Sequence, residues 1–446
     1  MKDSRKVLWS FLIVLIAAGL LFASGTKEAA ESEKVTLNVL NYIEATAPGY
    51  AEDQAVWQTF MDQNPDIILV KEELSNEPFH QKVSAYIAGG TLPDVMYMYP
   101  SGRSTSLHEK KLVKDLAPLL GPEFLANFVP AAIDPSGQSA KYLAELPQSI
   151  TYTTVMFANT KLLDELGLAL PKTYEDLKAM VPKLKAKGIQ TVLMANKDDW
   201  VMQSCLFSTI TGRMLGDSWI DAVKSGQAKF TDPAFVEALR FVETLYKDGV
   251  ISPNTIQVSY GEAPALFAAG KAAFLIDGDW RQNAFITDTS SNTALISPEA
   301  QEKDFTFMNF PAIPGEKNPG VVSAILGCGY GISAAIPAGS AKEAAAVKLI
   351  KYLYSTDVQR TYLEMGRYIS SRTDVKSDKL EPFIRKMSEY YGTIEKTSYV
   401  LDGILEPSVY TPLNSGLQEI GLGTKTPEQV ALSVQKAMDA LLASGK

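Results

Sequence analysis

The sequence predicts an α/β protein with two lobes, on the basis of two observations. Short apolar segments alternate with longer segments that have helical spacing, which is typical of a mostly parallel sheet flanked by helices. The alternation restarts at residues 151–196, which indicates a second sheet. The chain has 446 residues, enough for two or three domains that each bury a core.

The first unit is predicted over residues 35–98. It begins with a strand at 35–40, followed by a helix at 51–64, a strand at 67–70 and a helix at 77–90. The third strand, 95–98, lies in "AGGTLPDVMYMYPSGR" and finishes in large, partly polar side chains instead of Val, Ile or Leu. We expect Asp94, directly before it, to fix this region by capping or by hydrogen bonds to the backbone.

The second unit repeats this order further along the chain. A strand is predicted within 151–163, a capped helix at 173–188 and a strand at 191–196. Two later helices, at 340–355 and 426–445, begin with the N-cap residues Ser340 and Thr426. We therefore expect helices to flank both sheets.

The first 25 residues are predicted to be a secretory signal peptide. A basic start precedes the apolar run Val7–Ala23, and small residues suited to cleavage follow near Ala23-Ser24-Gly25. An uncleaved membrane anchor is the alternative, because the run has the length of a short spanning helix. Bacterial lipoproteins carry a Cys at this boundary, so Ser24-Gly25 excludes that attachment. In both cases we expect an exported protein, periplasmic or extracellular.

Composition argues against several functional classes. The net charge is −9 without a long basic run, which argues against nucleic acid as a partner. We expect Cys205 and Cys328 to be small buried residues and not a disulfide framework. His80 and His108 are the only histidines, too few for a histidine metal site or a Ser-His-Asp triad. No metal or cofactor is expected.

Three motifs have both a structural and a chemical interpretation. "GCGYG" at 327–331 lacks P-loop spacing and is predicted to be a bend where the backbone passes close to a neighbour. Asp277 and Asp279 in "IDGDW" form a glycosidase-like carboxylate pair or simply a turn. Tyr390 and Tyr391 in "EYYG" match the adjacent tyrosines of some secreted iron binders or form a half-buried packing face.

Aromatic residues carry the strongest functional signal. Tyr42, Tyr99, Trp200 and Trp280 each lie at or just beyond the carboxyl end of a predicted strand, where open α/β sheets bind ligands. Flat rings with a polar tip suit ligands that have apolar faces and hydroxyl edges. The pattern therefore predicts a cleft that binds sugars.

Five segments are similar to one family and occur in its order. They are "IAGGTLPDVMYM", "ELPQSITYTTVMFANTKLLDELGLALPKTYEDLKAM", "LFAAGKAAFLIDGDW", "LGCGYGIS" and "MGRYISSRTDV", the last with Ser370 where proline is commoner. On these motifs the chain resembles the extracellular solute-binding proteins of bacterial ABC importers, in the branch that contains the maltose-binding protein. The resemblance covers essentially all of the mature chain.

This resemblance implies the two-lobe periplasmic-binding-protein fold, with three hinge crossings near Tyr152, Gly327–Tyr330 and Arg367–Arg372. Residues 26–152 and 329–370 would form lobe 1, and residues 153–328 and 371–446 lobe 2. The family's ligand contacts, carried over by position, fall on Tyr42, Glu44, Met98, Tyr99, Ser101, Arg103, Tyr152, Asp199, Trp200, Asp279, Trp280, Arg281, Gly327, Arg367 and Tyr399. Met98 departs from the aromatic residue that is often found at its position.

The resemblance also implies a mechanism. A monomer would bind a mono- or oligosaccharide on one lobe, close about the crossings and present the sugar to an ABC permease, without catalysis. One alternative is a secreted glycoside hydrolase that uses Asp277 or Asp279 with Glu44. Another is a sugar-sensing receptor on the same fold.

Overall fold

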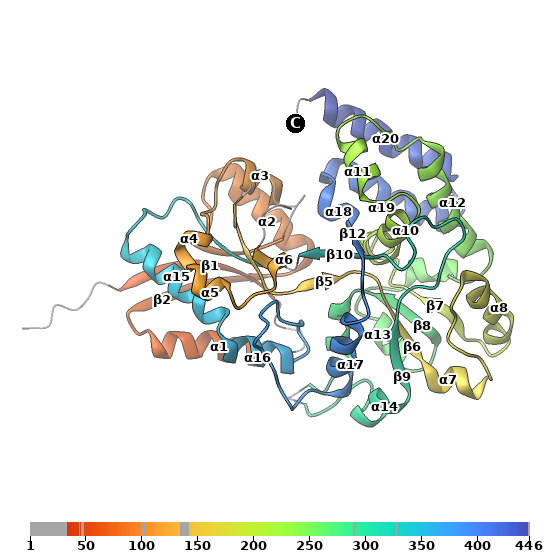
Figure 1. Ribbon diagram of the computed structural model, residues 1–446, viewed down its shortest axis with the longest axis horizontal. Coiled ribbons are helices and arrows are strands. Elements are labelled where there is room, and N and C mark those ends of the chain that lie inside the picture. Colours follow the sequence, from red (N-terminus) through yellow and green to blue (C-terminus); the bar gives the residue numbers. More distant parts are fainter. Residues whose placement is uncertain are drawn as a thin grey trace, which may run out of the picture.

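The computed structural model describes residues 34–43, 45, 49–99, 104–133, 142–288, 291–326 and 328–444. Figure 1 shows two bodies of mixed helix and strand, side by side and joined through β5 (Ile150–Tyr152) and β10 (Val322–Leu326). The predicted signal peptide and four candidate site residues lie outside the described residues: Glu44, Ser101, Arg103 and Gly327.

Lobe 1 is built on a five-stranded sheet in the order β2-β1-β3-β11-β4. β1 is parallel to β2 and β3, whereas β11 is antiparallel to β3 and β4. The strands are β1 (Val35–Tyr42), β2 (Ile67–Leu74), β3 (Val95–Met98), β4 (Leu146–Pro147) and β11 (Gly329–Ile332). The helices are α1 (Tyr50–Gln63), α2 (Asn76–Gly89), α3 (Thr105–Glu109), α4 (Ala117–Leu120), α5 (Pro122–Leu125), α6 (Pro130–Ile133), α15 (Ala341–Leu353) and α16 (Thr356–Glu364).

Helices cover both faces of this sheet because its strands are apolar on both sides. One face packs on α1 and α15 through a core that includes Leu37 and Trp57. The opposite face packs on α2 and α3 through Leu40 and Phe79. The predicted hydrogen bond from Asp94 to backbone is confirmed, since its Oδ2 accepts from the N–H of Asn38 at 2.8 Å, although the partner lies on β1.

Lobe 2 is built on a four-stranded sheet in the order β7-β8-β6-β9. The strands are β6 (Val155–Asn159), β7 (Gln190–Leu193), β8 (Ala272–Asp277) and β9 (Phe305–Met308). Only β7 and β8 pair in parallel, and β6 is antiparallel to β8 and β9. Both sheets are therefore mixed, and the prediction of mostly parallel sheets is wrong. The reason in lobe 2 is that β6 starts at the hinge and runs away from it, while β8 runs back.

The remaining helices surround the lobe 2 sheet, and Thr173 and Thr426 cap their helices as predicted, each within a capping box. They are α7 (Thr160–Glu165), α8 (Tyr174–Lys185), α9 (Trp200–Met202), η3 (Gln203–Phe207), α10 (Ser208–Met214), α11 (Asp217–Lys224), α12 (Pro233–Lys247), η4 (Pro253–Gln257), α13 (Ala263–Ala268), η5 (Asp279–Ala284), α14 (Pro298–Lys303), α17 (Pro382–Tyr391), α18 (Leu401–Ile404), α19 (Pro407–Gly421) and α20 (Pro427–Ala443).

The hinge consists of a small sheet and one further connection. β5 and β10 pair antiparallel and carry the first two crossings, and β12 (Thr397–Ser398) adds a third strand. The third crossing is predicted at Arg367–Arg372, and the chain contacts both lobes there: the Ser371 hydroxyl donates to the carbonyl of Pro147, and Ile369 packs against the lobe 2 core. Further along, the Ser377 hydroxyl donates to Glu364 of α16, and Glu381 accepts from the N–H of Thr287 in lobe 2. The lobe bounds given above stay a prediction.

Gly329 and Gly331 of "GCGYG" allow a close backbone passage, as predicted, but they lie in strand β11 and not in a bend. A Cβ at Gly329 would lie 1.9 Å from the carbonyl oxygen of Leu146, and one at Gly331 would lie 2.4 Å from the Met98 Sδ. Side chains at these positions would push β11 away from β4 and β3.

The cysteine predictions are confirmed in part. Cys205 is buried, as expected, whereas Cys328 is only half-buried, and the two are not joined in a disulfide. In the described part of the chain, no cluster of His, Cys, Asp and Glu has the make-up of a metal site. No helix within the same ranges has the length and apolar character needed to cross a bilayer.

We predict that Trp57→Ala destabilises lobe 1 strongly. Trp57 is fully buried, and its Nε1 donates to Asp53 Oδ2 at 3.1 Å, so the substitution removes core contacts and one donor to a buried carboxylate. The loss should be about 3–5 kcal/mol, the range for a buried Trp or Phe. Urea unfolding measures it. Trp219→Ala is the control, because Trp219 is half-buried and its removal should lower the free energy of unfolding by less. Equal losses for the two variants would contradict the assignment of Trp57 to the core.

Candidate functional site

A cluster of aromatic rings lies at the edge of the lobe 1 sheet where β1 and β3 end. The Tyr42 ring stacks on Tyr97 with centroids 5.4 Å apart, and it meets Tyr99 and Phe79 edge-on at 5.4 and 5.1 Å. His80 meets Tyr99 at 4.8 Å. The two predicted residues Tyr42 and Tyr99 are thus brought together. Phe79 and His80 were missed, because only the fold carries the first turns of α2 to this edge.

Tyr42 is held from two sides. Its hydroxyl donates to Asn76 Oδ1 at 3.2 Å and accepts from the N–H of Asn76 at 3.0 Å. Its carbonyl oxygen accepts from Arg367 Nη2 at 3.2 Å. The ring therefore has a defined position at the start of the loop that follows β1.

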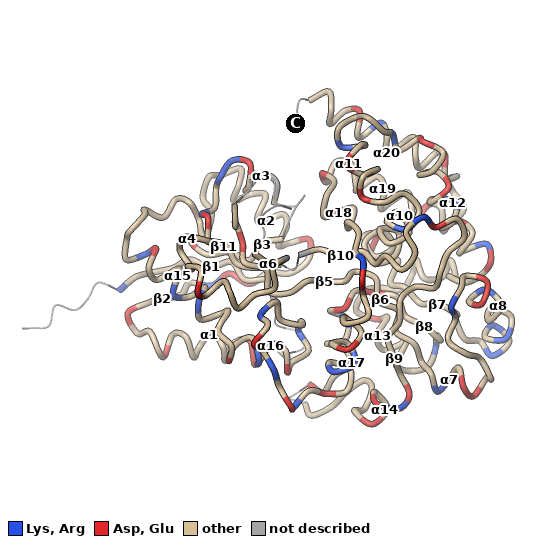
Figure 2. Tube along the Cα trace, viewed as in Figure 1, with Lys and Arg blue, Asp and Glu red and all other residues tan. Residues whose placement is uncertain are grey.

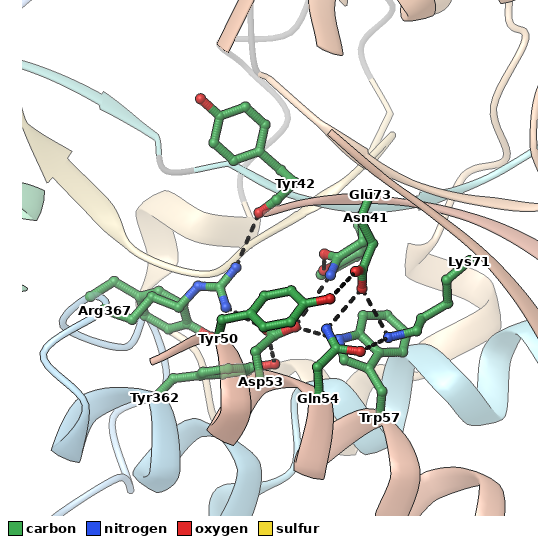
Figure 3. A network of polar contacts seen from close by, with 12 residues as sticks. Asn41, Tyr42, Tyr50, Asp53, Gln54, Trp57, Lys71, Glu73, Tyr362 and Arg367 are labelled. Carbon is green, nitrogen blue, oxygen red and sulfur yellow. Dashed lines mark hydrogen bonds and ion pairs between the residues drawn. The ribbon is translucent and has the colours of Figure 1, made fainter. Parts of the chain in front are cut away.

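Arg367 is itself fixed by a buried polar network, shown in Figure 3. Its Nη1 donates to the carboxylate of Asp53 on α1, which is fully buried. Burial by itself would lower the pKa of Arg367, but the Asp53 carboxylate raises it above its ordinary value. The hydrogen bonds described for Arg367 are therefore all made with residues of lobe 1. Its predicted contact with a ligand stays a prediction.

Lobe 2 presents a second set of rings, the wall formed by Trp200, Tyr260 and Trp280. The centroid of Trp200 lies 5.0 Å from that of Tyr260 and 6.3 Å from that of Trp280. The Trp280 Nε1–H donates to the Tyr260 hydroxyl. The indole lies over Gly278, where an added Cβ would be 2.2 Å from ring atoms. The two predicted tryptophans are thus neighbours, and Tyr260 is the residue that sequence reasoning missed.

An ion pair lies beside this wall. Arg281 Nε donates to Asp277 Oδ2 at 2.6 Å, and both side chains are buried. The guanidinium carbon lies 3.6 Å from the ring centroid of Tyr260, within the range of a cation–π contact. Burial would lower the pKa of Arg281, whereas Asp277 and Tyr260 raise it, and the net direction is upward. Arg281 is thus a buried, charged partner of Asp277.

Asp279 connects the wall to the hinge. Its Oδ2 accepts from the N–H of Tyr152 on β5 at 2.7 Å and from the hydroxyl of Tyr391. The rings of Tyr152 and Tyr391 meet edge-on at 4.6 Å. Burial raises the pKa of Asp279 to about 7, although both hydrogen bonds act to lower it. Tyr391, like Phe79, His80 and Tyr260, is a residue that the sequence did not assign to the site.

The other predicted residues have varied surroundings. Met98 is 1% exposed and packs in the lobe 1 core. Asp199 is half-buried, and its pKa is raised first by burial, then by Asp198 and also by Glu77 of α2. The N–H of Tyr399 donates to Asp217 at 2.9 Å. Figure 2 shows acidic and basic residues interspersed over both lobes.

We predict that the contribution of Asp279 to the free energy of unfolding decreases as the pH rises. Its pKa is raised from 3.8 to about 7 in the folded state, so its contribution is fully present below pH 4 and is lost as the pH rises through 7. A shift of this size corresponds to at most about 4 kcal/mol. Urea unfolding of wild type and Asp279→Asn at pH 4.5, 6 and 8 measures it, and the variant should depend less on pH. The same pH dependence in both proteins would contradict the prediction.

Comparison with known proteins adds a family match and relatives of similar length. A family model described as bacterial extracellular solute-binding protein matches residues 44–360. The chain is 22% identical over 379 residues to a multiple sugar-binding protein of Streptococcus mutans, covering 83% of each chain. It is 26% identical over 353 residues to a galactooligosaccharide-binding protein of Bacillus subtilis, covering 76% of this chain and 75% of that one.

Solved structures show the same fold at low identity. A chitin oligosaccharide binding protein superposes with a TM-score of 0.78 at 22% identity, covering 92% of this chain and 99% of the other. A maltose/maltodextrin-binding domain from Bdellovibrio bacteriovorus, bound to maltotriose, superposes with a TM-score of 0.69 at 21% identity, covering 92% and 100%.

Proposed function

The chain belongs to the bacterial extracellular solute-binding protein family, and from that premise we propose that it binds a mono- or oligosaccharide between its lobes and delivers it to an ABC permease. It acts as a monomer and requires no cofactor.

The single observation that carries the proposal is the pair of ring clusters, one on each lobe. Tyr42 and Tyr99 lie at strand ends in lobe 1, and Trp200 and Trp280 follow strand ends in lobe 2. Aromatic faces match the apolar faces of sugar rings, and the surrounding polar groups match hydroxyls. The names of the sugar-binding and oligosaccharide-binding relatives support the same ligand class.

The connections between the lobes support a closing motion. Two crossings pass through the short β5–β10 pair, and the chain contacts both lobes again near the predicted third crossing, Arg367–Arg372. Hinge closure about such segments is the general behaviour of periplasmic binding proteins. Closure brings the two ring clusters onto opposite faces of the sugar, and the permease recognises the closed form.

The carboxylates beside Trp280 support binding without hydrolysis. A glycosidase needs two carboxyl groups free to act on opposite sides of the glycosidic bond. Asp277 is buried in its ion pair with Arg281, and Asp279 is buried with hydrogen bonds from Tyr152 and Tyr391. The raised pKa of Asp279 would suit a general acid, but its hydrogen bonds hold it as a link between wall and hinge.

We predict that Trp280→Ala weakens sugar binding by more than roughly tenfold. An aromatic anchor in a binding site contributes at least about 2 kcal/mol, and each decade of affinity corresponds to about 1.4 kcal/mol. Calorimetric titration with maltotriose, xylotriose, chitotriose and galactose identifies the sugar that wild type binds, and the variant is then titrated with it.

Trp57→Ala is the matched control, because it should lower the melting temperature and leave the affinity of the folded protein nearly unchanged. A Trp280→Ala protein that binds normally but melts early would show that the ring is a core residue. Sugar breakdown over a day that is abolished by Asp279→Asn would overturn the proposal that the protein is not an enzyme.

The protein is exported, and we predict that its mature form starts near Thr26 and carries no lipid. The basis is the apolar run Val7–Ala23 followed by small residues without Cys. Intact mass of protein recovered from the native host measures the start of the chain. A mass that retains residues 1–25 would favour an anchored form.

A further inference from the structure

We propose that Tyr260 is a positioning residue of the sugar site: it fixes the orientation of Trp280 so that the indole meets the sugar with its face and not with its N–H. The inference rests on the proposed function. It goes beyond that function because it assigns a specificity-determining role to a residue outside the predicted contacts.

Tyr260 joins the two loops that carry the tryptophans. Its backbone N–H donates to Asp198 Oδ2 at 2.8 Å, in the loop that leads to Trp200. Its hydroxyl bonds to Trp280 and to Asp277 Oδ1, the latter at 3.4 Å, in the loop after β8. The ring contacts the guanidinium of Arg281, 3.6 Å from its centroid, and the ring of Trp200, with centroids 5.0 Å apart. Tyr260 is therefore anchored through its backbone, its ring and its hydroxyl.

The direction of the hydroxyl bonds follows from the chemistry of the partners. An indole N–H can only donate, so the Tyr260 oxygen must accept from Trp280. Its own proton is then directed to the Asp277 carboxylate, which can only accept. Burial raises the pKa of Tyr260 well above its ordinary value, so the proton is present throughout the physiological range. The chain of donors runs one way, from Trp280 through Tyr260 to Asp277.

Two contacts together fix the plane of the Trp280 ring. The Tyr260 hydroxyl holds the Nε1 edge, and Gly278 lies against one face of the indole with no room for a Cβ. Because Trp280 is only half-buried and its N–H is already bonded, the exposed part of the ring can contribute apolar contact alone. A ring held in its bound orientation loses less freedom when a sugar stacks on it, which favours affinity.

Tryptophan fluorescence of the ligand-free protein tests the positioning directly. Tyr260→Phe keeps the ring and removes the oxygen, so Trp280 should be quenched more by acrylamide than in wild type. This increase should be absent when Trp280 is also replaced by Phe. The control is Tyr174→Phe, at the start of α8 in the same lobe. This substitution removes the hydrogen bond of 2.5 Å that the Tyr174 hydroxyl donates to Asp248 Oδ2. Quenching equal to wild type in Tyr260→Phe would overturn the proposal.

A double-mutant cycle tests the consequence for binding, using whichever of maltotriose, xylotriose, chitotriose and galactose the wild type binds. Tyr260→Phe should weaken binding about two- to twelvefold, the effect of losing one hydrogen bond of about 0.5–1.5 kcal/mol. In the Trp280→Ala background it should cause no further loss, because Tyr260 acts through Trp280. Tyr174→Phe should bind as wild type does.

The outcomes separate the two proposals. If the losses of sugar affinity caused by Tyr260→Phe and Trp280→Ala are fully additive in the double mutant, Tyr260 acts independently of Trp280. That result would overturn its positioning role. A wild-type protein that binds none of the four sugars would count against the proposed function alone. The fluorescence result would still decide whether Tyr260 orients Trp280.

Discussion

Lobe 1 is organised around one buried carboxylate, that of Asp53, which requires a cationic partner and hydrogen-bond donors. Asp53 is fully buried on α1, and a charge in that place is stable only when it is paired and hydrogen-bonded. It accepts from Asn41 on β1, from Trp57 on its own helix, from Tyr362 on α16 and from Arg367. Segments far apart in the sequence are thereby held together. Since Arg367 also bonds the carbonyl of Tyr42, this compensation reaches the first ring of the proposed site.

In lobe 2 a second buried carboxylate, Asp277, lies beside the wall formed by Trp200, Tyr260 and Trp280. The carboxylate at the end of β8 pairs with Arg281 and accepts from Tyr260, and the Tyr260 hydroxyl in turn bonds Trp280. In each lobe a buried carboxylate is therefore linked by hydrogen bonds to an aromatic residue of the candidate site, Tyr42 in lobe 1 and Trp280 in lobe 2. Rigid lobes are what a hinge mechanism requires, because the motion is then confined to the short connections between them.

Much of the fold was predictable from the sequence, because the strands and helices follow from local patterns. The helix that starts after Thr173 and the one after Thr426 have the capping boxes that their sequences encode, and Trp200 and Trp280 come together as strand-end residues should. The orientation of β6 was not predictable. An apolar strand has the same pattern in either direction, and only the route of the chain through the hinge makes β6 antiparallel to its neighbours.

The sequence by itself determined the two α/β units, the export signal pattern, the family motifs and the positions of four rings after strands. Only the tertiary structure decided how those rings are supported. Phe79, Tyr260 and Tyr391 join the candidate site, while Arg367 and Arg281 bond inside their lobes. The physical reason is that a charged or aromatic side chain has no local signal for its partner. Its role depends on which distant groups the packed chain places within hydrogen-bonding distance.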